Sequence, residues 1–341
     1  MNGSRIWTIA RLELMQRLRS PGWYILLGVF ALVLLIVTVL ALMAFSYTPT
    51  AGAGAYSVIV MLVLLLVVLI SPTLSGSSIN GDRDAATLAS LQITLASTGD
   101  IMIGKLLAAI ITGAAFLVVA VPFLVVSMLA GAVRPDVLLV SLLVLAAEIV
   151  IVAAIGVGWS GLVVRPLFSV ANTYLVVAAL CVGTLLIFGL AGSVIRTDVE
   201  VRDRVWDSQG GPDCDSWQTQ TVQLPRFDYV WGFLAANPFV VLADATPTTY
   251  SAYGSPNDMF GGIKLSVRSA QLPPQTLNTY DPCLEGPDGG HPTPKEIIGS
   301  TTPSWFVGLG IQIVIAAGLF AGAWARTRTP ARRLPPGTRI A

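Results

Sequence analysis

Three short stretches of this sequence hold residue types that could do chemistry. The first, GDIMIGKL from Gly99 to Leu106, has the glycines and the lysine of a phosphate-binding loop, but leucine stands where a magnesium-binding serine or threonine belongs. The stretch also follows a helical segment and opens an apolar run, whereas a phosphate-binding loop follows a strand. We therefore expect this chain to bind no nucleotide itself.

The second stretch, GWSG from Gly158 to Gly161, has the form in which intramembrane serine proteases present their nucleophile. A catalytic serine needs an imidazole base within hydrogen-bond reach. The only histidine, His291, lies in a polar region away from the apolar runs. We therefore predict no catalytic residue, and we interpret the small residues as positions where helices pack closely.

The third candidate is Glu148, an acid in the middle of an apolar run. An ionised carboxylate at the centre of a bilayer costs a few kcal/mol on insertion scales, so we expect Glu148 to face protein or water, or to carry a proton. Two roles stay open: a polar point on a substrate or ion path, or a hydrogen-bonding contact between helices. No second acid, histidine or cysteine cluster accompanies it, so we expect no metal site.

Composition indicates the elements that must position these residues. Of 341 residues, 54% are hydrophobic and 11% are charged, and the mean hydropathy is +0.75. Such values are typical of an integral membrane protein. We predict an all-α fold in which six apolar runs each cross about 30 Å of hydrocarbon as a helix. The runs are residues 23–47, 56–76, 106–133, 137–164, 167–195 and 305–325.

Basic residues predict the orientation of these spans, because cytoplasmic loops are rich in lysine and arginine. They gather before the first span, between the second and third spans, and in the tail 326–341. We therefore expect both termini in the cytoplasm and the tail as a basic anchor beside anionic lipid. Seventeen arginines against three lysines hint at a GC-rich genome, and we expect the cytoplasmic (inner) membrane of a bacterium.

Residues 1–22 predict an amphipathic interfacial helix ahead of the first span. At about 100° per residue, Trp7, Ala10, Leu14 and Leu18 form one apolar stripe. The charged residues, including Glu13 and Arg17, fall on the other side of this helix. Such a helix would lie flat in the inner headgroup layer.

Residues 196–303 form a polar region between the fifth and sixth spans, and the charge count puts it outside. Within it, residues 227–245 are apolar but too short to cross, and Asn237 and Pro238 interrupt them. A re-entrant hairpin and a core helix of a small external domain both fit this stretch. Cys214 and Cys283 are the only cysteines of the region, so we predict a disulfide between them. Cys181 lies alone in the fifth span and is expected to pack.

The segment 77–105, between the second and third spans, is charged and helix-prone. Its pattern comprises Gly81, Asp82 with Arg83, Thr87 with Leu88, and Gly104 with Lys105. With the N-terminal helix and six spans, this pattern resembles the membrane subunit of an ABC type-2 exporter. Two positions depart from the family pattern: Asp82 stands where glutamate is commoner, and Ala86 where glycine often precedes the threonine. Asn237 and Pro238 are similar to the Asn-Pro common before the family's last span.

The resemblance implies a permease that performs no chemistry of its own. The segment 77–105 would be a coupling helix that docks on a separate ABC ATPase subunit, where ATP and magnesium bind. A dimer with a second or homologous permease would export a hydrophobic or amphiphilic substrate such as a drug, lipid or peptide, and nucleic acid is not an expected partner. The implied docking residues are Asp82, Arg83, Thr87, Leu88, Leu91 and Lys105. An alternative is a polytopic protein whose external domain binds or modifies a lipid-linked or extracellular ligand.

Overall fold

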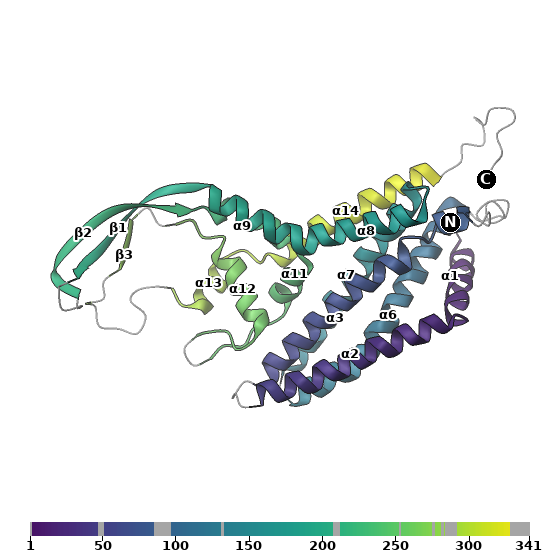
Figure 1. Ribbon diagram of the computed structural model, residues 1–341, viewed down its shortest axis with the longest axis horizontal. Helices are drawn as coiled ribbons and strands as arrows, with labels where there is room; N and C mark the ends of the chain where they lie inside the picture. Colours follow the sequence, from purple (N-terminus) through teal and green to yellow (C-terminus); the bar gives the residue numbers. More distant parts are fainter. Residues whose placement is uncertain are drawn as a thin grey trace. The chain divides into compact units, whose positions relative to one another are not determined.

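The computed structural model is mostly helical (Figure 1). It describes residues 2–46, 51–84, 97–130, 133–206, 212–251, 254–274, 277–280, 283 and 292–327. The chain divides into two compact units, which we describe separately. The first holds residues 1–180 and 309–341, and the second holds residues 181–308.

The six predicted spans are confirmed as six helices that are long and apolar enough to cross a membrane. Together they fit a multi-pass membrane protein. The helices are α2 (Pro21–Phe45), α3 (Ala51–Ser75) with its continuation α4 (Asn80–Asp84), α6 (Thr98–Ala130), α7 (Pro135–Leu162), α8 (Pro166–Ala178) with its continuations η1 (Ala179–Gly183) and α9 (Thr184–Val194), and α14 (Trp305–Thr327).

In the first unit α3 is the central helix and packs against α2, α6, α7 and α8. Its apolar side chains, such as Ile59, Val63 and Leu64, are buried. The peripheral helix α2 instead exposes large apolar side chains such as Ile25, Leu32 and Leu40. In water such a face would be unfavourable, whereas in a bilayer it would contact lipid.

Small residues let α7 approach its neighbours closely, which confirms our interpretation of GWSG. A Cβ atom added to Gly158 would lie 2.8 Å from Cβ of Leu319, and one added to Gly161 would lie 2.6 Å from Cβ of Ala323. Both contacts are with α14. Side chains larger than hydrogen at these two positions would push α14 away from α7.

The N-terminal helix α1 (Gly3–Leu18) forms as predicted, but our assignment of its faces was partly wrong. Glu13 and Arg17 do not face away from the bundle; they are half-buried and make contacts within it. Trp7 and Leu18 of the predicted stripe are exposed by 53% and 52%. The helix thus buries Ile9 and Ala10 and half-buries Glu13 and Arg17 beside them. Periodicity alone could not reveal the polar contacts, because the bonding partners lie on distant segments.

The second unit contains a three-stranded sheet, so the prediction of an all-α fold was wrong for this region. Its strands are β1 (Arg196–Trp206), β2 (Pro212–Pro225) and β3 (Leu277–Tyr280), in the order β2-β1-β3. β1 pairs antiparallel with β2 and parallel with β3. The signal for β1 was present in the sequence: Thr197, Val199 and Val201 alternate with exposed charged residues.

Short helices complete this unit: η2 (Phe227–Tyr229), α10 (Trp231–Ala235), α11 (Pro238–Ala245), α12 (Met259–Ser269) and α13 (Pro294–Ser300). The predicted hairpin 227–245 is therefore η2, α10 and α11. Asn237 caps α11 by accepting from the Phe239 backbone amide at 2.9 Å, while its side-chain amide donates to the Cys181 carbonyl at 2.7 Å. A π turn such as η1 disturbs the regular pattern of helical hydrogen bonds. The side chain of Asn237 supplies a hydrogen-bond donor to the Cys181 carbonyl in this turn. Entry of this hairpin into a membrane stays a prediction.

Asp244 is the most heavily bonded acid among the described residues of the second unit. Its carboxylate accepts two bonds from Arg268, at 2.8 and 3.2 Å, and the backbone amides of Ser304 and Trp305 donate to it at 2.6 and 3.0 Å. Arg268 also donates to the Thr301 carbonyl at 2.7 Å. Asp244 therefore caps the N-terminus of α14, where a negative charge is favourable.

The predicted disulfide between Cys214 and Cys283 is present, with Cα atoms 5.9 Å apart. It ties β2 to the chain that follows β3, across a sequence separation of 69 residues. Since β3 is short, the bond also limits how far that strand can move from β1.

We predict that Cys214→Ser with Cys283→Ser loosens the sheet of the second unit. In the chain-entropy model, a bond closing a loop of about 70 residues contributes roughly 4 kcal/mol to the free energy of unfolding. Hydrogen exchange of the full chain in detergent should therefore accelerate in β1, β2 and β3, with the first unit unchanged. Cys181→Ser is the control, because it removes a thiol outside this bond, and equal exchange rates in both variants would contradict the prediction.

Candidate functional site at the polar end of the first unit

A buried lysine organises one end of the first unit. Lys105, near the start of α6, is 1% exposed, and its Nζ lies 2.6 Å from Oδ2 of Asp82 in α4. The same ammonium group donates to the carboxylate of Glu13 in α1. A buried ammonium group is stable only when it is paired and hydrogen-bonded, so three segments that are far apart in sequence must meet at this point.

The neighbouring residue explains how α1 comes so close to α6. A Cβ atom added to Gly104 would lie 2.9 Å from Cβ of Ile9, so any larger residue would force α1 away. Gly104 and Lys105, the last two residues of the exporter-like pattern, thus have complementary roles. The glycine permits the contact between α1 and α6, and the lysine fixes it electrostatically.

Ser160 of the GWSG stretch joins the end of α7 to the start of α4. Its hydroxyl accepts from the backbone amides of Ile79 and Asn80, at 2.7 and 3.1 Å, and donates to Oδ1 of Asn80 at 3.1 Å. The amide of Asn80 also donates to the Val163 carbonyl at 3.1 Å. The hydroxyl therefore satisfies amide groups at a helix start, which is a structural task and not a nucleophilic one.

Asp100 joins the starts of α1 and α6. Ser97 and Asp100 form a reciprocal cap, in which the Ser97 amide donates to Asp100 at 3.0 Å and the Asp100 amide donates to the Ser97 hydroxyl at 3.2 Å. The other carboxylate oxygen of Asp100 accepts from the Asn2 amide at 3.0 Å. Asn2 in turn caps α1 by accepting from the Ser4 amide.

Arg17 joins α1 to the end of α3 and to the interior of α6. Its guanidinium donates to the Leu74 carbonyl at 2.6 Å, in the last turn of α3, and to the Thr112 hydroxyl of α6 at 3.0 Å. Carbonyl groups at a helix C-terminus lack partners within the helix and favour a nearby cation. Desolvation by burial lowers the pKa of Arg17, yet arginine stays charged at any physiological pH.

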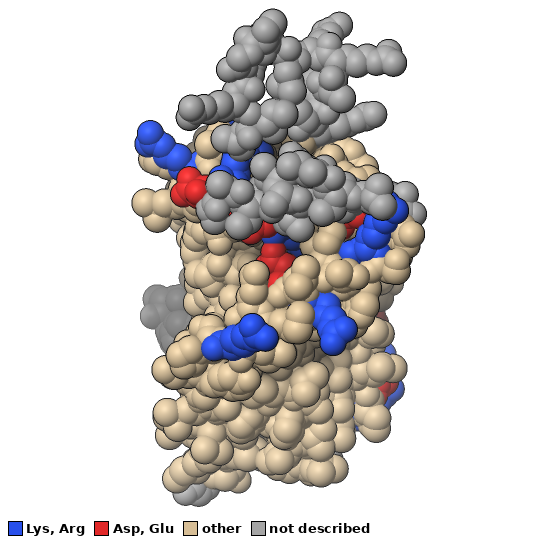
Figure 2. Space-filling model, turned by 90° about the vertical axis from the view of Figure 1, so that its right-hand side faces the viewer, with Lys and Arg blue, Asp and Glu red and all other residues tan. Residues whose placement is uncertain are grey.

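Figure 2 views this end of the molecule. Basic and acidic side chains lie beside one another in the upper part of the view, and the lower part of the same face carries almost none. Beneath the charges lies an apolar cluster, onto which Phe320 and Trp324 of α14 also pack. Its buried members are Ile9, Ile79, Ile101, Met102, Val157 and Ala323.

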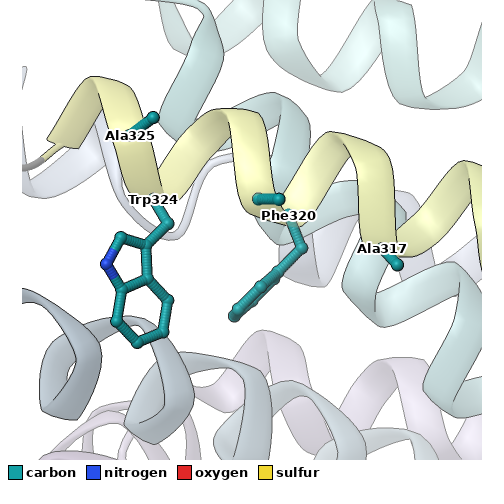
Figure 3. A pocket seen from close by; sticks show the side chains of 5 residues that line it. Ala317, Phe320, Trp324 and Ala325 are labelled. Carbon is teal, nitrogen blue, oxygen red and sulfur yellow. The ribbon is translucent and has the colours of Figure 1, made fainter.

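A shallow apolar groove of about 490 Å³ runs along α14 beside this cluster (Figure 3). Phe320 and Trp324 project from the same side of the helix. A Cβ atom added to Gly99 would lie 2.6 Å from the Trp324 ring, so the tryptophan covers the first turn of α6. The other lining residues are Ala317, Ala321 and Ala325.

Of the predicted docking residues, the structure brings Asp82, Arg83 and Lys105 to one end of the unit. Thr87, Leu88 and Leu91 lie outside the described residues, as does the tail beyond residue 327. Glu148 belongs to another place, near the middle of α7, and Asn237 with Pro238 belongs to the second unit. Residues 99–106 lie in α6, so Lys105 is part of a helix. Its ammonium group forms ion pairs with two carboxylates.

Sequence reasoning missed four residues of this site: Glu13, Arg17, Asn80 and Ser160. Glu13 and Arg17 lie four residues apart and thus on one face of α1, but this spacing does not indicate that the face is buried. For Asn80 and Ser160 no local signal existed, because their partners are about 80 positions away in sequence.

No protein-family model matches the sequence, and a search of curated proteins finds no match.

We predict that Lys105→Met lowers the thermal stability of the chain strongly. It leaves Glu13 and Asp82 partly buried without their cation, and breaking a buried ion pair costs about 3–5 kcal/mol. Arg134→Met is the matched control, since its pair with Asp136 is mostly exposed and worth about 0–1 kcal/mol. Unfolding midpoints in the same detergent compare the two variants, and equal midpoints would show that Lys105 is not the anchor.

Ser160→Ala should cost about 1–3 kcal/mol, because it leaves the Ile79 and Asn80 amides buried without an acceptor. Ser169→Ala is the comparison: Ser169 is also fully buried, but its hydroxyl has no hydrogen-bond partner among the described residues. That second substitution should leave stability unchanged or raise it. Thermal unfolding measures both, and the reverse order would rule out the capping role.

Proposed function

We propose that this chain is the permease subunit of an ATP-driven exporter in the cytoplasmic membrane of a bacterium. One observation carries the proposal: the segment 77–105 is bonded near both of its own ends to the same end of the first unit. Lys105 bonds the later part of the segment to α4 and α1, and Asn80 bonds the earlier part to α7. A partner that moved the segment would therefore act on α1, α4, α6 and α7 together.

Such an arrangement suits a protein that receives mechanical work. Residues of the pattern that resembles exporter permeases lie close together in the structure. Asp82 and Lys105 pair with each other, and Gly104 permits the contact of α6 with α1. Energy for transport would come from ATP bound at a separate subunit. Docking of that subunit would shift the permease between inward- and outward-accessible states.

The distribution of charge supports the orientation within this proposal. The site is rich in arginine and lysine, and the adjoining tail 326–341 adds further arginines. Under the positive-inside rule this end faces the cytoplasm, where an ATPase subunit would be available. The polar residues 196–303 would then lie outside, where a disulfide persists.

The dimer within this proposal has a candidate contact surface on α14. Ala317, Ala321 and Ala325 repeat every four residues and are exposed. Small residues at this spacing allow two membrane helices to approach closely. A dimer of permeases would enclose a path between its copies, and the apolar lining of such a path favours a hydrophobic or amphiphilic substrate.

Co-purification tests the proposal directly. The chain isolated in mild detergent from its native membrane should bring an ABC ATPase subunit with it. Arg83→Glu combined with Leu88→Asp should remove at least nine-tenths of that subunit, because it inverts one charge and inserts another in the proposed docking segment. Arg134→Glu, a charge reversal at the far end of α6 and α7, should retain the subunit.

Each variant must keep the unfolding midpoint of the native chain, so that loss of the partner is not loss of the fold. A native chain that brings no ATPase, or a double variant that retains a full complement of it, would refute the proposed function.

A further inference from the structure

Glu148 is the most isolated acid of the molecule among the described residues. It lies near the middle of α7, about 20 Å from either end at 1.5 Å per residue, and it is fully buried. Neither carboxyl oxygen has a hydrogen bond of standard geometry among the described residues. Its polar neighbour is Gln312 of α14, which is fully buried as well.

Among the residues that the structure describes, no cation pairs with this carboxyl group. The elements packed on α7 are α3, α6, α8 and, through Gly158 and Gly161, α14. Neither α3 nor α8 contains a charged residue, and α7 itself adds only Asp136 at its start. The charged residues of α6 and α14 are Asp100, Lys105 and Arg326, all close to helix ends.

The remaining titratable groups on these helices are also engaged elsewhere. Tyr56 of α3 bonds to the Ser141 hydroxyl of α7 at 2.6 Å, about two turns from Glu148. Tyr174 of α8 donates to the Leu69 carbonyl at 2.7 Å. The polar neighbour of Glu148 that the structure shows is therefore a neutral amide, that of Gln312.

A buried carboxylate without a cation or donor is unstable, and such a group neutralises instead of remaining charged. The described residues hold no group of three or more histidine, cysteine, aspartate or glutamate side chains that could bind a metal ion at this position. A proton neutralises the carboxylate, and the protonated carboxyl becomes a donor to the Gln312 amide oxygen, which can accept.

We infer that Glu148 is a proton-binding site between α7 and α14. In the arrangement described it holds a proton at neutral pH, as a neutral carboxylic acid facing Gln312. Ionisation would leave an uncompensated charge in this buried contact, so protonation stabilises the contact between α7 and α14. The inference does not depend on the proposed export function.

Infrared spectroscopy of the full chain in a detergent without ester groups tests this inference, because lipid ester carbonyls absorb where a protonated carboxyl does. A protonated carboxylic acid has a carbonyl-stretch band above the carboxylate bands, and ordinary glutamates are ionised at pH 7. The native chain should show this band at pH 7, and Glu148→Gln should lose it while keeping the unfolding midpoint. Asp136→Asn, which changes an exposed carboxylate paired with Arg134 on the same helix, should keep the band.

A second measurement needs no variant. Glutamate carrying ¹³C in its side-chain carboxyl should shift the band in the native chain, and ¹³C-labelled aspartate should not. A native chain without the band at pH 7, or a band that shifts only with labelled aspartate, would overturn the inference. A band that persists in Glu148→Gln would overturn it equally.

Discussion

The burial of one ammonium group, that of Lys105, constrains the whole polar end of the first unit. A cation that is 1% exposed must find anions, and here they come from α1 and α4, which are distant from α6 in sequence. Once Glu13 and Asp82 are in place, α1 lies against Gly104, and Arg17 reaches the end of α3. Separate hydrogen bonds, those of Ser160 with Asn80 and of Asp100 with Asn2, add α7 and the start of α1 to this end.

The molecule solves the problem of a buried charge in different ways. Lys105 has two carboxylates, whereas Asp244 has a guanidinium and the amides of a helix start. Both arrangements hold separate segments together, because removing either partner would leave a charge uncompensated. Glu148 has neither a cation nor a charged donor, and a neutral form is the solution that its surroundings favour. Asp244 and Glu148 are both buried, but Asp244 has charged and backbone donors beside it and Glu148 does not. This difference in hydrogen-bond donors, more than the depth of burial, is why we assign proton binding to Glu148.

The spans and the disulfide could be predicted from the sequence, because long apolar runs and an isolated pair of cysteines are local or compositional signals. The strands β1 and β2 were missed although Val199 and Val201 alternate with charges, since the overall composition favoured helices. The buried face of α1 was beyond prediction for another reason. Glu13 and Arg17 have the character of surface residues until Lys105 and Leu74 are known to lie opposite them. Such pairings join residues that are distant in sequence, and they leave no local pattern from which a single sequence could predict them.

The order of synthesis determines when the cap of α14 can form. Asp244 is translated 60 residues before Ser304, and it must wait for that amide before its bonds are complete. Until then Arg268, made 24 residues after Asp244, is the first partner to emerge. Helix α14 is therefore synthesised after Asp244 and Arg268, when the carboxylate that caps it can already be paired with a cation. The cap of α14 thus depends on folding of the residues before this helix, and a chain damaged at Asp244 or Arg268 would leave the first amides of α14 without their carboxylate.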